Sequence, residues 1–177
     1  MATWAPDLYA YYGEKLGALH ERDFSLQRIF ASSVFSATTY NFGPQTMCFK
    51  HKDFGNLAFG LCSVTALGDF DPTKGGHLVL WELGLAIEFP LGSTILLASA
   101  LISHSNAKIA ANETRYSVAQ YSAGALFRWV DNGFQRSEDL YNPLPVSERE
   151  TLEFLDTFNW DYGLSKLPIY PVATQAT

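Results

Sequence analysis

The residues with the clearest capacity for chemistry lie in the segment FKHKDFGN, residues 49–56, where His51 and Asp53 stand two positions apart. In an extended segment, side chains at positions i and i+2 leave the same face, so this imidazole and this carboxylate point at one spot. The pair suits two ligands of a metal ion, and it equally suits a hydrogen-bonded turn. A metal site requires a third ligand from another part of the chain.

Three other histidines can be tested as that third ligand. His20 falls in a segment with helical spacing, where a solvated helix end explains it. His77 opens the segment HLVLWEL, and strand alternation puts it in phase with Val79 and Trp81, which favours a packed or edge histidine. His104 ends the apolar run TILLASALIS just before a turn, and the end of a strand at the mouth of a barrel is a suitable place for a ligand.

A cation and a hydroxyl group follow at the head of the next apolar segment, TRYSVAQY. Arg115 and Ser117 lie two positions apart there and therefore share a face of the expected strand. A guanidinium in an apolar sheet is costly unless it meets an anion. Arg115 either pairs at the rim with Glu113 or Asp131, or clamps a small dicarboxylate to which the Ser117 hydroxyl adds a second donor.

The elements that must position these residues are mainly strands. The chain has 177 residues, of which 47% are hydrophobic and 15% aromatic, a composition that favours one domain with a core of pleated sheet. From residue 34 to residue 131, short β-branched and aromatic runs alternate with turn segments rich in Gly, Pro, Asn and Asp. We predict eight strands, at residues 34–42, 45–50, 58–67, 77–82, 85–89, 94–102, 115–121 and 125–131. This pattern predicts a mainly β fold with flanking helices (α+β), a double-stranded β-helix of the cupin-like jelly-roll kind.

Helical spacing appears on both sides of this core. We expect helices at residues 6–20 and 25–30, and a third over PVSERETLEFLDTF, begun by a capping box of Ser147 and Glu150 and packed outside one sheet. We expect the tail 172–177 to be disordered. The chain is thus read as one domain, 1–177, with a helical prelude 1–33, a jelly-roll core 34–131 and a C-terminal helical segment and tail 132–177.

Aromatic residues recur through the predicted strands. We expect most of them to fill the jelly roll, and one or two to stack on a planar substrate. They are Tyr40, Phe42, Phe49, Phe54, Phe59, Trp81 and Tyr121.

Charge and cysteine content narrow the classes of partner. The net charge of −6 argues against a broad electrostatic grip on phosphate backbones, which needs clustered Lys and Arg. Cys48 and Cys62 lack the spacing of a disulfide framework, so we expect reduced thiols and an intracellular setting, cytoplasmic or nuclear. No cationic leader or membrane-length apolar run is present, so no membrane association is expected, and nothing indicates an obligate protein partner.

The order His-x-Asp, then His, then Arg-x-Ser, each on a different predicted strand, is more specific than any of its parts. In this order the chain resembles the Fe(II)/2-oxoglutarate-dependent dioxygenases. More narrowly, in the segments from NFGPQTMCFKHKDFGN to LISHSN and from ETRYSVAQY to WVDNGF, it resembles the fungal proteins assigned to the TET/JBP oxygenase group, over residues 4–134.

The resemblance implies an iron site and a cosubstrate site. Iron would be held by His51, Asp53 and His104, and the 5-carboxylate of 2-oxoglutarate by Arg115 and Ser117, with Tyr40 and Asn41 within reach of the cosubstrate. Two imidazoles and one carboxylate leave open positions on Fe(II) for 2-oxoglutarate and dioxygen. The implied reaction oxidises the methyl group of a modified pyrimidine such as 5-methylcytosine or thymine, in nucleic acid or in a smaller molecule. The alternatives are oxidation of a small metabolite or a protein side chain, and a catalytically silent jelly roll that binds a ligand.

Overall fold

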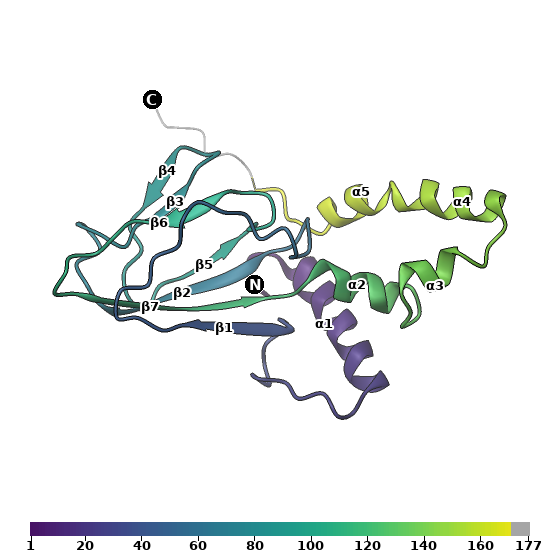
Figure 1. The fold of residues 1–177 in the computed structure, drawn as a ribbon, viewed down its shortest axis with the longest axis horizontal. Helices are drawn as coiled ribbons and strands as arrows, with labels where there is room; N and C mark the ends of the chain where they lie inside the picture. Colours follow the sequence, from purple (N-terminus) through teal and green to yellow (C-terminus); the bar gives the residue numbers. More distant parts are fainter. Residues whose placement is uncertain (171–177) are drawn as a thin grey trace.

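The computed structural model describes residues 1–170 and shows a mixed α+β fold with two antiparallel sheets (Figure 1). The expectation of a disordered tail at 172–177 lies outside the described residues. The strands are β1 Ala37–Asn41, β2 Cys62–Asp69, β3 Leu78–Leu80, β4 Leu85–Ile87, β5 Thr94–Leu97, β6 His104–Asn106 and β7 Thr114–Tyr121. The helices are α1 Pro6–Arg22, α2 Gly124–Asp131, α3 Ser137–Tyr141, α4 Val146–Asp156 and α5 Asn159–Leu164.

The four-stranded sheet has the order β1-β7-β2-β5, so β7 is paired on both sides. Its register sets Ser117 opposite Asn41 on β1 and opposite Ala66 on β2. Alternation along β7 buries Arg115 and Ser117, whereas Tyr116 between them points to the other face. The sheet therefore turns the Arg-x-Ser pair toward the interior, as the sequence predicts.

The three-stranded sheet has the order β4-β3-β6 and lies across from the first. Leu78 and Leu80 of β3 are buried in a core with Cys62 and Ala66 of β2 and Leu97 of β5. Side chains of both sheets thus meet in one core, as in a jelly roll. The complete strand order of a double-stranded β-helix stays a prediction.

A second core joins α1 to the end of the sheets. Pro6 begins α1, and Leu8, Tyr12 and Leu16 are buried at helical spacing, which confirms the first predicted helix. The ring of Phe127 on α2 stacks on Tyr11 with a centroid distance of 5.4 Å and meets Tyr12 edge-on at 4.9 Å. This packing explains why the predicted strand 125–131 is wrong: burial of Phe127 against α1 selects a helix for a segment with strand-like composition.

Two other sequence predictions fail for local reasons. Residues 25–30 form no helix, because the backbone N–H and hydroxyl of Ser25 both donate to the Asp23 carboxylate, at 2.9 and 2.6 Å, and close a turn instead. Residues 45–50 form no regular strand. That segment has an isolated bridge from Gln45 to Arg115, and the N–H of Cys48 donates to the side chain of Asn106 at 2.7 Å rather than to a strand backbone.

Helices α3 to α5 form an arm that extends away from both sheets (Figure 1). The third predicted helix exists as α4, but no residue of it is buried, so the prediction that it packs outside a sheet is wrong. The capping box is also wrong: the helix begins at Val146 with Pro145 at its N-cap, which places Ser147 inside the first turn. Among residues 1–170, no helix is long and apolar enough to cross a bilayer.

Candidate metal centre and anion pocket

Two histidines from distant parts of the chain are joined directly by their backbones. The N–H of His51 donates to the carbonyl of His104 at 3.1 Å, and the N–H of His104 donates to the carbonyl of His51 at 2.9 Å. In such an antiparallel pair both side chains leave the same face. The ring centroids consequently lie only 4.3 Å apart. His104 begins β6 after a turn at residues 98–103, rather than ending the strand before it.

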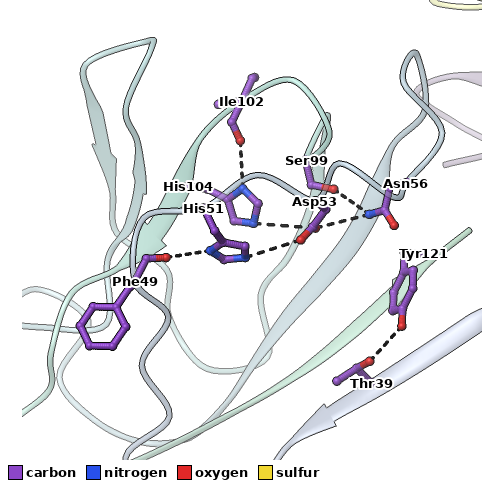
Figure 2. Close-up of polar contacts among 9 residues, drawn as sticks. All are labelled: Thr39, Phe49, His51, Asp53, Asn56, Ser99, Ile102, His104 and Tyr121. Atoms are coloured by element: carbon purple, nitrogen blue, oxygen red, sulfur yellow. Dashed lines mark hydrogen bonds and ion pairs between the residues drawn. The ribbon is translucent and has the colours of Figure 1, made fainter. Parts of the chain in front are cut away.

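Both imidazoles are oriented by carbonyl groups. The Nδ1 of His51 lies 2.7 Å from the carbonyl oxygen of Phe49, and the Nδ1 of His104 lies 2.9 Å from that of Ile102 (Figure 2). A carbonyl can only accept, so each Nδ1 carries the donated proton and a neutral ring keeps its lone pair on Nε2. Backbone acceptors of this kind are the usual partners of metal-binding histidines.

The Asp53 carboxylate faces the Nε2 atoms of both imidazoles. Its Oδ1 lies 3.6 Å from Nε2 of His51 and its Oδ2 lies 3.9 Å from Nε2 of His104. Two lone pairs facing a carboxylate repel it, unless a cation lies between them or the rings are protonated. The three ligand atoms lie within 4.8 Å of one another, whereas neighbouring ligands on a metal with bonds of about 2.1 Å are roughly 3 Å apart. Side-chain shifts of less than about 1 Å would therefore let the three groups bind one ion, and the donor set is consistent with Fe(II).

An asparagine that the sequence did not single out holds the carboxylate. The Nδ2 of Asn56 lies 3.3 Å from Oδ2 of Asp53 and donates to the hydroxyl of Ser99 at 3.0 Å (Figure 2). The backbone N–H of Asp53 donates to the carbonyl of Ser99 at 2.9 Å. The turn DFGN, with Asn three residues after Asp, is the local signal from which Asn56 could have been found.

Glu82 joins the two ligand-bearing segments from outside the cluster. Its carboxylate accepts from the N–H of Ser103 at 2.7 Å and from the Ser103 hydroxyl at 2.6 Å, and it pairs with Lys52 at 3.2 Å. Ser103 precedes His104, and Lys52 lies between the other two ligands. These bonds, above all the one from the Ser103 side chain, lower the pKa of Glu82 to about 2. No sequence signal marks Glu82, because its partners come from two distant segments.

Arg115 is a buried cation that has no counterion in the part of the chain that the structure describes. Only 3% of the residue is exposed, its Nη1 donates to the carbonyl of Thr46 at a long 3.3 Å, and its Nε has no partner within residues 1–170. Burial lowers the pKa of the guanidinium. An unpaired buried guanidinium is a costly arrangement that an anionic ligand would relieve.

The rim-pairing alternative for Arg115 is wrong. The carboxylate of Glu113 accepts instead from the backbone N–H groups of Asp71 and Ala110, both at 2.8 Å. Asp131 lies on α2 and pairs with Lys15 at 2.7 Å.

One cavity of about 400 Å³ joins the ligand cluster to the arginine. It is lined by the three candidate metal ligands together with Asn41, Arg115 and Ser117. The Nδ2 of Asn41 donates to the Ser117 hydroxyl at 2.9 Å, so this hydroxyl keeps its own proton to donate. Six of the seven predicted site residues therefore line a single cavity.

Tyr40 is the predicted site residue that the structure does not bring to the cavity. Strand alternation on β1 turns Asn41 and Thr39 inward and Tyr40 outward, where its ring stacks on Phe42 at 6.2 Å. The prediction that it contacts the cosubstrate is therefore wrong in this geometry.

The other aromatic residues that the sequence singled out are partly buried or in the cavity and partly exposed. Phe59 is buried, and Tyr121 lines the cavity with its hydroxyl 3.3 Å from that of Thr39 (Figure 2). The remaining predicted core aromatics are exposed: Tyr40, Phe42, Phe49, Phe54 and Trp81. His20 and His77 lie outside the ligand cluster, as expected.

The comparisons with known proteins add a distant likeness of fold. No protein-family model matches the chain, and no curated protein matches it. Among solved structures, the chain is similar to NgTET1 in complex with 5mC DNA, with a TM-score of 0.46 and 16% identity, over 68% of this chain and 50% of that one. The matched region therefore spans half the length of that protein. The resemblance to TET/JBP dioxygenases that the sequence motifs indicate has its counterpart in the site, where the His-x-Asp pair and the distant histidine form one cluster.

Proposed function

We propose that the chain is an Fe(II)- and 2-oxoglutarate-dependent dioxygenase that oxidises a C–H bond. The observation that carries the proposal is a single cavity that presents candidate metal ligands on one wall and a buried cation on another. One wall presents two imidazole lone pairs and a carboxylate, which call for a cation. Another wall presents the unpaired guanidinium of Arg115, which calls for an anion.

Each residue has a definite task in this proposal. His51, Asp53 and His104 hold Fe(II), which when bound supplies the activation of dioxygen needed to oxidise an unactivated C–H bond. Arg115 clamps the 5-carboxylate of 2-oxoglutarate. The hydroxyl of Ser117 accepts a hydrogen bond from Asn41, so its own proton is free to be donated to the same carboxylate.

Positioning residues keep the ligand atoms in place. The carbonyl groups of Phe49 and Ile102 fix the imidazole orientations, and Asn56 fixes the Asp53 carboxylate. Burial of Arg115 at 3% exposure keeps water from competing for its donors. The domain proposed for this activity is the single unit 1–177.

By the resemblance of its sequence motifs, we propose the methyl group of a modified pyrimidine as the site of oxidation. Tyr121 lines the cavity and offers a ring on which a planar base can stack. The acidity of the chain is concentrated away from this cavity. Residues 137–164, which include the projecting arm, contain seven acidic residues and one arginine, whereas residues 1–136 contain eleven acidic and ten basic residues. The part that holds the cavity is therefore almost neutral, and the net charge of −6 is a weak objection to a nucleic-acid substrate.

Anaerobic ligand binding tests the proposal. Adding Fe(II) and 2-oxoglutarate together should produce a weak visible charge-transfer band and raise the melting temperature, since both ligands bind the native state. Succinate release should then be measured with methylated oligonucleotides, free nucleobases and peptides. Release with peptides or small molecules alone would replace the substrate proposed here, and the absence of both the band and the thermal shift would favour a silent binding module.

A further inference from the structure

Two free cysteines line the same cavity in very different settings. Cys48 is half-buried, whereas Cys62 is buried at 4% exposure and packed in the core between the sheets. Burial raises the pKa of the Cys62 thiol. Cys48 is therefore the thiol that a small solute entering the cavity can reach.

The position of Cys48 is fixed by both of its backbone groups. Its N–H donates to Oδ1 of Asn106 at 2.7 Å, and its carbonyl accepts from the N–H of Asn106 at 3.3 Å. Thr46, two residues earlier, accepts the hydrogen bond from Nη1 of Arg115 at 3.3 Å. The segment that carries the thiol is thus held against both β6 and the buried guanidinium.

Arg115 gives this cysteine a chemical partner. Both side chains line the same cavity, and the hydrogen bond to the Thr46 carbonyl ties Arg115 to the segment that carries the thiol. The unpartnered Nε of Arg115 is a donor available to a new anion in the cavity. An acid group formed on the sulfur would share this cavity with a cation that has no counterion among residues 1–170.

We propose that Cys48 is an oxidation site that controls access to the anion pocket, an inference that rests on the proposed 2-oxoglutarate site. The oxidant is hydrogen peroxide. In the first step the sulfur bonds to one peroxide oxygen, the O–O bond breaks, and the thiol becomes a sulfenic acid with release of one water. A second peroxide converts the sulfenic acid to a sulfinic acid and a second water, and the sulfinic proton passes to solvent. Sulfur loses two electrons in each step, and each peroxide is reduced by two.

The two products have different consequences. The sulfenic acid adds an oxygen to the wall of the pocket and is returned to the thiol by small thiols. The sulfinate carries a negative charge, pairs with Arg115, and so competes directly with the carboxylate of 2-oxoglutarate. Peroxide thus switches the cosubstrate site off in two stages, the first reversible.

The experiment uses the full chain with Mn(II), which replaces Fe(II) so that peroxide is not consumed by the metal. Before and after peroxide treatment, mass spectrometry locates the added oxygen atoms and calorimetry measures 2-oxoglutarate affinity. Oxidation should fall on Cys48 before Cys62 and should weaken 2-oxoglutarate binding by about tenfold or more. Cys62→Ser should keep the whole effect, and Cys48→Ser should lose it.

A second readout separates this inference from the proposed function. Pairing of the sulfinate with Arg115 should raise the melting temperature of the oxidised chain, and Arg115→Met should abolish that rise. If the untreated chain does not bind 2-oxoglutarate, the proposed function fails, while the melting temperatures still decide whether the sulfinate meets Arg115. Oxidation of Cys48 with unchanged 2-oxoglutarate affinity, or preferential oxidation of Cys62, would overturn the inference.

Discussion

Replacing Arg115 by methionine should move stability and ligand affinity in opposite directions. Methionine has a similar length and no charge, so it removes a buried cation that has no counterion within the described part of the chain. Among residues 1–170, the only side-chain hydrogen bond lost is the long one, 3.3 Å, from Nη1 to the carbonyl of Thr46. A residue kept for stability alone would give the opposite result, because its loss would destabilise the fold.

The size of the stability change follows from the removal of the buried charge and the loss of this hydrogen bond. Leaving an uncompensated charge buried costs several kcal/mol, and one long charged hydrogen bond returns about 1.5 kcal/mol. We expect Arg115→Met to stabilise the ligand-free fold by about 1–3 kcal/mol. In a chain of this size each kcal/mol shifts the melting temperature by about 2–4 °C, so the expected rise is about 2–12 °C.

Ligand binding should fall at the same time. Losing a clamp on a carboxylate costs about 3 kcal/mol, which is roughly a 100-fold loss of 2-oxoglutarate affinity. At a 2-oxoglutarate concentration of 100 times the wild-type Kd, stabilisation by the ligand should drop from about 2.7 kcal/mol to about 0.4 kcal/mol.

Thermal unfolding with Mn(II), with and without 2-oxoglutarate, measures the stability of the fold without 2-oxoglutarate and the stabilisation that 2-oxoglutarate adds. Arg128→Met is the matched control, because Arg128 is exposed on α2 and does not line the cavity. It should change neither quantity appreciably. A less stable Arg115→Met protein that keeps its 2-oxoglutarate response would refute the assignment of an anion site to Arg115.

Other residues give independent tests. His104→Ala should abolish retention of Fe(II) or Mn(II) in equilibrium dialysis whereas His77→Ala retains it, and the reverse pattern would identify a different third ligand. Asn56→Ala should weaken metal binding about 10-fold by freeing the Asp53 carboxylate, and an unchanged affinity would show that Asp53 is held without it. Glu82→Gln should weaken metal binding about 10- to 100-fold, and Glu88→Gln, on the exposed surface, should not. Because the pKa of Glu82 is lowered to about 2 from an ordinary 4.5, its contribution to stability is present above pH 4.5 and lost as the pH falls toward 2. Urea unfolding over that range should show a shallower loss of stability for Glu82→Gln than for the wild type.

The sequence predicts the parts of the site that depend on alternation. Residues two apart on one strand must share a face, so Arg115 and Ser117 could be placed together without knowing the fold. The same rule, applied to β1, puts the neighbours Tyr40 and Asn41 on opposite faces, and the structure was needed to show that Asn41 is the one that faces the cavity.

Long-range partners account for most of what the sequence does not predict. Glu82 acts on Lys52 and Ser103, and no local spacing links those three residues. The helix at 124–131 depends in the same way on α1, against which Phe127 packs. The segment GALFRWVD, with two aromatic residues and one β-branched residue, contains no local sign that such a partner exists.

The charges of the cavity suggest why a cation and a dianion belong together in it. Asp53 and Arg115 contribute one negative and one positive charge to the lining of a single cavity, which is therefore neutral without ligands. A divalent cation alone would add two positive charges near a buried guanidinium, and a dianion alone would add two negative charges near the Asp53 carboxylate. Bound together, Fe(II) and 2-oxoglutarate restore neutrality, and each offsets the desolvation of the other's charge. Each ligand should consequently tighten the binding of the other, and linkage requires the two enhancements to be equal.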